Sequence, residues 1–150
     1  MVNNASLRRL VVGQYKLSKQ SKDDDRRRVR NGPIFELSVV KELVREHGVR
    51  ILNTNAQRAM LTDFDPPLED SEIQEIIVHA LRHDDEKTHY VESEICKANG
   101  MVVDCDAYSI RWNRIRHKES NCSRAIYLKF GFKENRPICL IVRVHPDKYK

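Results

Sequence analysis

The sequence lacks long apolar runs, and it contains few of the residues that break regular structure. Among 150 residues there are five glycines and five prolines, and 40% of the residues are hydrophobic. This composition excludes a fibrous or wholly disordered chain and is typical of one globular domain. No apolar segment is long enough to span a bilayer, and no signal peptide is recognisable, so we expect a cytoplasmic protein without a membrane partner.

Closely spaced cysteine pairs are also missing. The four cysteines are Cys96, Cys105, Cys122 and Cys139, and no two of them form a Cys-x-x-Cys motif. A structural zinc site usually needs such pairs or histidines at ligand spacing. We therefore expect four free thiols in a reducing compartment.

The net charge of +5 conceals a segregation along the chain. Residues 1–33 carry nine basic and three acidic side chains, residues 34–103 carry seven and fourteen, and residues 104–150 carry eleven and five. A basic patch on one structural layer is typical of a nucleic-acid binder, although an uneven soluble surface gives the same counts.

Residues 1–33 are interpreted as a basic, mobile extension, and residues 34–150 as the functional domain. The extension contains three consecutive aspartates followed by three arginines, a density of charge that leaves little to bury. It is either a solvated tail or an arm that adds non-specific affinity for RNA.

Hydrophobic periodicity divides residues 34–150 into helices followed by strands, which predicts an α+β fold. Gly48 is expected to end the first helix, and Ser71 with Gln74 forms a capping box that opens the last one. The expected elements are a helix over 35–47, a strand over 49–52, a short helix over 56–61 capped by Thr54 or Asn55, a helix over 71–81, an edge strand over 88–95, and strands over 102–113, 124–132 and 138–145.

The last two strands place polar residues on one side of a hairpin. Strand side chains alternate between faces, so the even-numbered residues are expected in the core and the odd-numbered ones outside. The expected register pairs Tyr127 with Arg143 and Lys129 with Ile141. The outer face then gathers Tyr127, Lys129, Arg143 and His145, a set that can bind a phosphodiester and move protons around it.

Short motifs recur along the chain in a definite order. They are Val40-Lys41-Glu42-Leu43-Val44, Gly48-Val49-Arg50, the short helix over 56–61, the acidic and apolar segment 63–65 before the helix over 73–81, Asp106-Ala107-Tyr108, Tyr127-Leu128-Lys129 and the apolar strand over 138–145. In this order and at nearly this spacing they resemble the MqsR-type mRNA interferases, toxins of bacterial toxin–antitoxin pairs. The resemblance runs from about Phe35 to His145.

The resemblance implies a RelE-like fold, in which two to three helices cover one face of a small antiparallel sheet and RNA binds in a groove on the other face. It also implies an endoribonuclease that uses no metal cofactor, cleaves single-stranded mRNA, and is silenced by a cognate antitoxin protein with which it can form an oligomer. By position, the family's functional tyrosine falls at Tyr127, its lysine after the second helix at or next to Lys87, and its terminal-strand lysine at His145.

We interpret His145, Tyr127, Arg143, Lys87 and Lys129 as the catalytic set. Cleavage without a metal uses the 2′-hydroxyl of the RNA as the nucleophile, so the protein must transfer protons and stabilise phosphoryl charge. His145 is the best candidate for a general acid or base because imidazole titrates near neutral pH. Arg143 has the fork geometry that holds a phosphate through two bonds.

A second set is interpreted as RNA-binding, on the strand over 102–113 and the loop after it. Its members are Tyr108, Arg111, Arg114, Arg116 and Lys118. Arginine clusters at a sheet edge suit a single-stranded phosphate backbone. Two other functions stay open: a catalytically inactive RNA-binding or regulatory module on the same fold, and a protein-interaction domain without RNA contact.

Overall fold

The computed structural model describes residues 16–17, 26–30, 32–82, 89–98, 100–133 and 136–147. The elements in these ranges are β1 (Lys16–Leu17), β2 (Arg26–Arg30), α2 (Leu37–His47), β3 (Val49–Ile51), α3 (Thr54–Thr62), α4 (Asp70–Ala80), β4 (Tyr90–Ala98), β5 (Met101–Asn113), β6 (Lys118–Glu119), β7 (Ala125–Phe132) and β8 (Cys139–Pro146). The predicted α+β class is confirmed. None of the described helices is long and apolar enough to cross a membrane.

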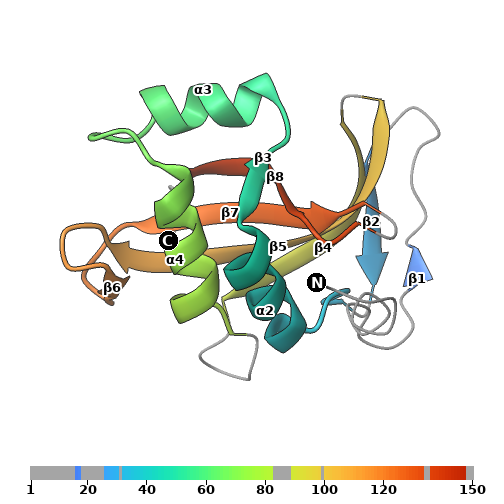
Figure 1. Ribbon diagram of the computed structural model, residues 1–150, viewed down its shortest axis with the longest axis horizontal. Coiled ribbons are helices and arrows are strands. Elements are labelled where there is room, and N and C mark those ends of the chain that lie inside the picture. Colours follow the sequence, from blue (N-terminus) through green and yellow to red (C-terminus); the bar gives the residue numbers. More distant parts are fainter. Residues whose placement is uncertain are drawn as a thin grey trace.

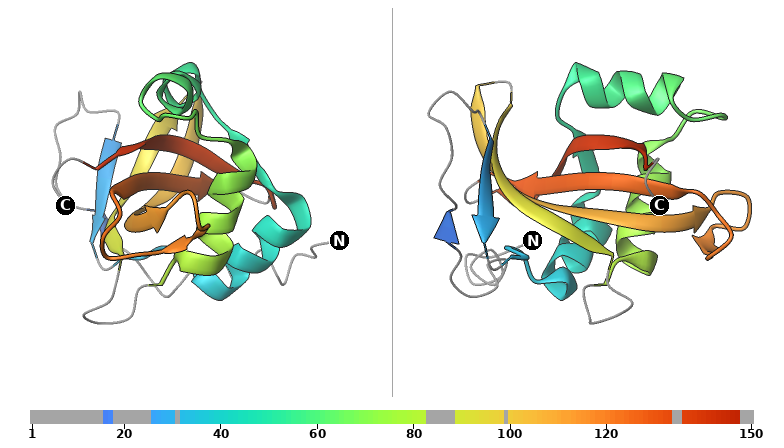
Figure 2. Two further views of the ribbon diagram at one scale, coloured as in Figure 1. Left: turned by 90° about the vertical axis from the view of Figure 1, so that its left-hand side faces the viewer. Right: turned by 180° about the vertical axis from the view of Figure 1, so that it is seen from behind.

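One twisted sheet organises the described residues. Its strands follow the order β1-β2-β4-β5-β7-β8-β3, with β6 paired to β5. All neighbours are antiparallel except β3, which runs parallel to β8 at one edge. Helices α2 and α4 lie against one face, which we call the helix face, and α3 lies beyond the β8 edge (Figure 1). No described helix covers the opposite, open face (Figure 2).

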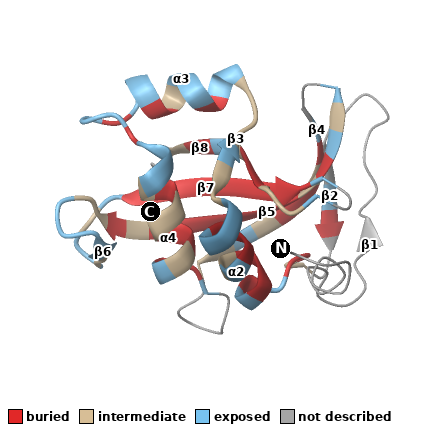
Figure 3. Ribbon diagram, in the orientation of Figure 1, coloured by how far each residue is buried: buried red, intermediate tan, exposed pale blue. Residues whose placement is uncertain are grey.

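The main core fills the space between the helix face and helices α2 and α4. Val40 and Leu43 of α2, Ile73 and Ile77 of α4, and Leu128 of β7 are all at most 1% exposed. The buried sides of these helices face the sheet and their exposed sides face solvent (Figure 3). Burying a large aliphatic side chain stabilises a fold by about 1.5–3 kcal/mol, so this layer holds the helices in place.

Helix α2 ends where the sequence predicts. Gly48 has a φ of 73°, and its backbone N–H donates to the carbonyl of Val44 over 2.8 Å. Side chains other than glycine rarely adopt this left-handed conformation. The turn at Gly48 therefore directs the chain straight into β3, beside β8.

A buried carboxylate fixes the start of this helical layer. Asp106 of β5 is 0% exposed, and its two oxygens accept the backbone N–H groups of Ile34 and Phe35, each over 2.9 Å. The hydroxyl of Ser93 on β4 donates to the same carboxylate. Asp106 thus ties the segment that precedes α2 to the middle of the sheet.

A β-bulge in β8 sets which of its residues reach the open face. Lys129 pairs with Arg143, but the next residue of β7, Phe130, pairs with Ile141, so Val142 is an extra residue. An extra residue reverses the alternation of side chains beyond it. Val144 therefore lies in the helix-face core with Ile141, whereas Leu140 lies in a second cluster with Cys96, Val103 and Cys105.

The bulge corrects two expectations about the hairpin. Tyr127 pairs with His145 rather than with Arg143, and Lys129 pairs with Arg143 rather than with Ile141. The expectation that the even-numbered residues of the last strand build one core is wrong for Leu140 and Val142, which pack in the second cluster. The alternation in β5 is confirmed, because Tyr108, Ile110 and Trp112 are buried in the main core.

Other boundaries differ from the expectations. The N-cap of α3 is Asn53, whose side chain accepts the N–H of Ala56 over 2.8 Å, rather than Thr54 or Asn55. Helix α4 begins at Asp70 after Glu69 and has no side-chain cap bond, so the capping box at Ser71 is not formed. Strand β4 lies inside the sheet between β2 and β5, and the sheet is larger than expected.

Part of the N-terminal extension belongs to this sheet. Strand β2 pairs with β4, with Val29 opposite Ser93, and Val29 is 5% exposed within the main core. Residues 1–15, 18–25 and 31 of the extension lie outside the described residues. The strands β1 and β2 extend the sheet beyond the expected 34–150 boundary.

We predict that Asp106→Ala lowers the free energy of unfolding by about 3 kcal/mol or more, because three buried donors lose their acceptor. Urea titration followed by circular dichroism measures the change. Glu42→Ala removes an exposed carboxylate on α2 and is the control, with an expected change of about 0.5 kcal/mol or less. Equal losses in the two variants would contradict the anchoring role of Asp106.

Candidate functional site

A cleft of about 910 Å³ separates α3 from the open face of the sheet. Helix α3 forms one wall, and β8 with the ends of β4 and β7 forms the other. The basic side chains that line the cleft are Lys97, Arg124, Lys129, Arg143 and, when protonated, His145. A second hollow of about 790 Å³ lies on the other side of α3, next to β3. The structure thus brings three of the residues predicted as catalytic to one cleft, with Tyr127 directly beside them.

Small side chains on β5 form the floor of the open face. Ala107 lies between Glu92 of β4 and Lys129 of β7, and Cys105 lies between Glu94 and Gly131. These small residues let long side chains of β4 and β7 meet above β5. Gly131 is required here, because a methyl group at this position would lie 2.0 Å from a backbone oxygen of β5.

Lys129 is held in a buried ion pair. Its Nζ lies 2.8 Å from Oε2 of Glu94, and the two side chains are 3% and 7% exposed. The ammonium is therefore neutralised within the floor of the cleft. Breaking such a pair from one side leaves a buried charge without a partner, which is strongly destabilising.

Tyr127 connects Glu92 of β4 with the histidine of β8. Its hydroxyl donates to Oε1 of Glu92 over 3.2 Å, and its ring stacks on His145 with centroids 4.7 Å apart and planes 9° apart. Burial, and then the negative charge of Glu92, raise the pKa of Tyr127. The phenol therefore stays protonated near neutral pH and fixes the imidazole plane.

The hydrogen bond of His145 defines its tautomer. Nδ1 lies 2.8 Å from the carbonyl oxygen of Pro146, which can only accept, so Nδ1 carries a proton. Nε2 is then the nitrogen that can take up or release a proton. His145 is half-buried and lines the cleft, which suits a group that exchanges protons with a ligand.

Three cations that line the cleft are available to a ligand. Arg143, Arg124 and Lys97 are exposed, and none of them forms an ion pair with another described residue. Arg143 lies opposite Lys129 in the register, two pairs from His145. The cleft therefore presents unneutralised positive charge along a wall that also carries an imidazole, which favours an anionic ligand.

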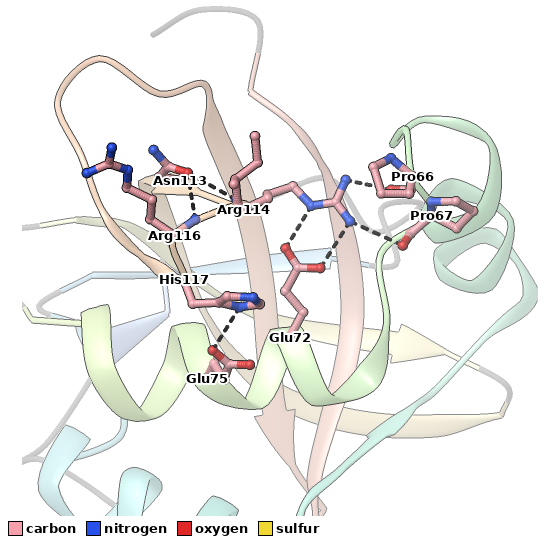
Figure 4. Close-up of polar contacts among 9 residues, drawn as sticks. Pro66, Pro67, Glu72, Glu75, Asn113, Arg114, Arg116 and His117 are labelled. Carbon is pink, nitrogen blue, oxygen red and sulfur yellow. Dashed lines mark hydrogen bonds and ion pairs between the residues drawn. The ribbon is translucent and has the colours of Figure 1, made fainter.

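The RNA-binding set predicted from sequence is not gathered at this cleft, because none of its members lines it. Arg114 is a structural clamp: its guanidinium bonds to Glu72 over 2.7 and 3.0 Å and to the carbonyls of Pro66 and Pro67 (Figure 4). Arg111 donates to the carbonyl of Ser123 over 3.0 Å. Each of these arginines therefore has a structural partner.

The remaining predicted residues have different positions. Tyr108 is 0% exposed and stacks on Phe130 in the main core, so we remove it from the RNA-binding set. Arg116 is exposed on the turn that follows β5, and Lys118 is exposed at the start of β6. Lys87 lies outside the described residues. The four cysteines are free, as predicted.

Sequence reasoning missed several residues of this region. Glu92 and Glu94 of β4 flank Ser93 at strand spacing, and this alternation was the available signal. Arg28 of β2 adds an ion pair with Glu92 over 3.2 Å. Lys97 and Arg124 carry no local signal, since the fold alone brings them to the cleft.

Comparison of the chain with protein-family models, curated proteins and solved structures found no match. The resemblance to MqsR-type interferases therefore stays a prediction. Among the described residues, no group of three or more His, Cys, Asp or Glu side chains could hold a metal ion.

We predict that Lys129→Met lowers the free energy of unfolding by about 3–5 kcal/mol, since the buried carboxylate of Glu94 loses the ammonium that neutralises it. The double variant Lys129→Met/Glu94→Leu is expected to recover most of this loss. Denaturant titration of the single and double variants measures the coupling. Lys97→Met, at an exposed lysine of the same cleft, is the control, and an equal effect of the two single changes would refute the buried pair.

Proposed function

We propose that this protein is an endoribonuclease that cleaves single-stranded mRNA by attack of the 2′-hydroxyl on the adjacent phosphate. The observation that carries the proposal is the cleft in which His145 lies beside Arg143, with Arg124 and Lys97 farther along it. An imidazole next to a guanidinium can exchange a proton and bind a phosphate at once. The exposed cations match the spaced charges of a nucleic-acid backbone.

In this reaction, Nε2 of His145 takes the proton of the 2′-hydroxyl while the 2′-oxygen bonds to phosphorus. The 5′-oxygen then leaves and takes a proton from water, which yields a cyclic phosphate and a free 5′-hydroxyl. Arg143 stabilises the charge that develops on the phosphoryl oxygens. Tyr127 and Lys129, which sequence reasoning placed in the catalytic set, act as positioning residues, because their polar atoms are held by Glu92 and Glu94.

The biological role within this proposal is that of a toxin in a toxin–antitoxin pair. It rests on the order of the sequence motifs between Phe35 and His145, which also supports a RelE-like fold and a cytoplasmic location. A cognate antitoxin protein would silence the enzyme. Toxicity on expression that a neighbouring open reading frame relieves would test this role separately from the chemistry.

One observation favours a second candidate, a catalytically inactive RNA-binding module. The ammonium of Lys129 and the hydroxyl of Tyr127 are both engaged with acids in the floor of the cleft, and His145 is the only histidine among the described residues that line it. The module predicts RNA binding at the same cleft without fragments. The next experiment separates it from the enzyme.

We predict that the purified protein cleaves a long single-stranded RNA into discrete fragments in the presence of EDTA. His145→Ala should slow cleavage by about 100- to 10,000-fold, the usual value of a general acid–base group. Arg143→Ala should slow it by at least about 100-fold, because one donor to the developing charge is lost. Gel electrophoresis of time courses gives the rates.

His79→Ala is the matched control, because it removes an exposed histidine of α4, which lies on the helix face. Its cleavage rate should equal that of the wild type. RNA binding without fragments in every variant would exclude the enzyme and support the module, whereas cleavage that survives His145→Ala would exclude the assigned base.

A further prediction concerns the salt dependence of RNA binding. For single strands, the slope of log affinity against log salt changes by about 0.7 for each phosphate contact. Arg124→Ala and Lys97→Ala should each reduce the slope by about this amount. Arg116→Ala and Lys118→Ala, on the exposed turn after β5, should leave it unchanged, and the opposite result would move the RNA from the cleft to that turn.

A further inference from the structure

The two walls of the cleft differ in chemistry. The strand wall carries Lys97, Arg124, Arg143 and the half-buried His145. On the helix wall, α3 presents Asn55, Ala56 and Ala59, followed by Asp63 at its end. No described residue of the helix wall that lines the cleft is cationic.

This division follows from helix geometry. Residues 55, 59 and 63 are spaced by four, and residues 56 and 59 by three, so they share one face of α3. Residues on the other side of the helix, Gln57, Met60 and Leu61, line the second hollow instead. The arginine of this helix, Arg58, is exposed and lines neither hollow.

The helix wall is fixed against the strand wall at one point. The side-chain amide of Asn53 donates to the carbonyl of Val142 over 3.0 Å, and its oxygen caps α3 at Ala56. Val142 is the bulge residue that directly precedes Arg143. The distance between the phosphate-binding strand and the wall that carries Asp63 is therefore built into the fold.

A carboxylate in a cleft that binds phosphates repels the phosphate backbone of the ligand. A favourable contact with Asp63 therefore requires a hydrogen-bond donor on another part of that ligand. A polynucleotide that lays its phosphates along the strand wall turns its bases toward the other wall. Single-stranded RNA is read through the Watson–Crick edges of such exposed bases. A carboxylate only accepts hydrogen bonds, so it can pair with exocyclic amino groups but not with carbonyl oxygens.

We infer that Asp63 and the adjoining face of α3 form a base-reading subsite that favours bases with an exocyclic amino group over uracil. The methyl group of the half-buried Ala59 provides an apolar surface beside the base. Asp63 accepts the amino hydrogens at the cleft rim, where its side chain is exposed in the absence of a ligand. This inference rests on the proposed RNA-binding function and assigns its specificity.

Cytosine and uracil provide the sharpest comparison, because they have nearly the same size and carry an amino group and a carbonyl oxygen, respectively, at the same ring position. Uracil also has an N3–H donor, but this donor lies between two carbonyl oxygens that repel a carboxylate. Oligonucleotides of equal length, all cytidine or all uridine, with 2′-O-methyl groups that prevent cleavage, are titrated against the full chain by fluorescence anisotropy. The wild type should bind the cytidine oligonucleotide about tenfold more tightly, the value of one hydrogen bond to a charged acceptor.

Asp63→Asn and Asp63→Ala should both abolish this preference, because an amide also donates and a methyl group does neither. Glu42→Gln removes the same charge from the exposed side of α2, and the preference should persist in this control. Equal binding of both oligonucleotides to the wild type, or a preference that survives both Asp63 variants, would overturn the subsite while RNA binding stands. Failure of the wild type to bind either oligonucleotide would overturn the proposed function, and the subsite with it.

Discussion

A single extra residue in β8 decides what the open face can do. With Val142 bulged out, Arg143 and His145 share the open face with Lys129 and Tyr127, while Ile141 turns to the helix-face core. In a regular strand, side chains alternate between the two faces with a period of two. Ile141, Arg143 and His145 would then all have faced the same side of the sheet. The bulge lets β8 contribute apolar residues to two cores at one end and polar residues to the cleft at the other.

The acidic and basic segments of the sequence contact each other in the folded sheet. Acids of β4 do not remain apart from the basic strands, because the small residues of β5 let Glu94 neutralise Lys129 and let Glu92 bind Tyr127. Lys129 and the hydroxyl of Tyr127 are thereby satisfied, whereas Arg143, Arg124 and Lys97 line the cleft without an ion pair to another described residue. From net charge alone, the basic loop after β5 would also be expected to bind an anionic ligand, although Arg114 is bound to Glu72.

Local periodicity predicted most elements of this fold, and it failed where distant contacts decide. Alternation placed Tyr108 and Ile110 in the core, and the stop at Gly48 was correct. The register of β7 with β8 could not be predicted, because a bulge leaves no mark in the alternation of either strand alone. The clamp at Arg114 joins residues 42 or more positions apart, and no short-range pattern contains that information.

The buried bonds of Asp106 have a consequence for the way this chain is made. Asp106 holds the backbone of Ile34 and Phe35 across 72 and 71 positions, respectively, and β3 pairs with β8 across a still longer separation. A ribosome releases the first half of the chain before it has synthesised either of these partners. The meander from β4 to β8 consists of neighbours in sequence and can form by itself, whereas α2 and β3 must wait for it. The cleft is therefore complete only after β8 has been synthesised, and a product truncated before β8 lacks the wall that carries His145.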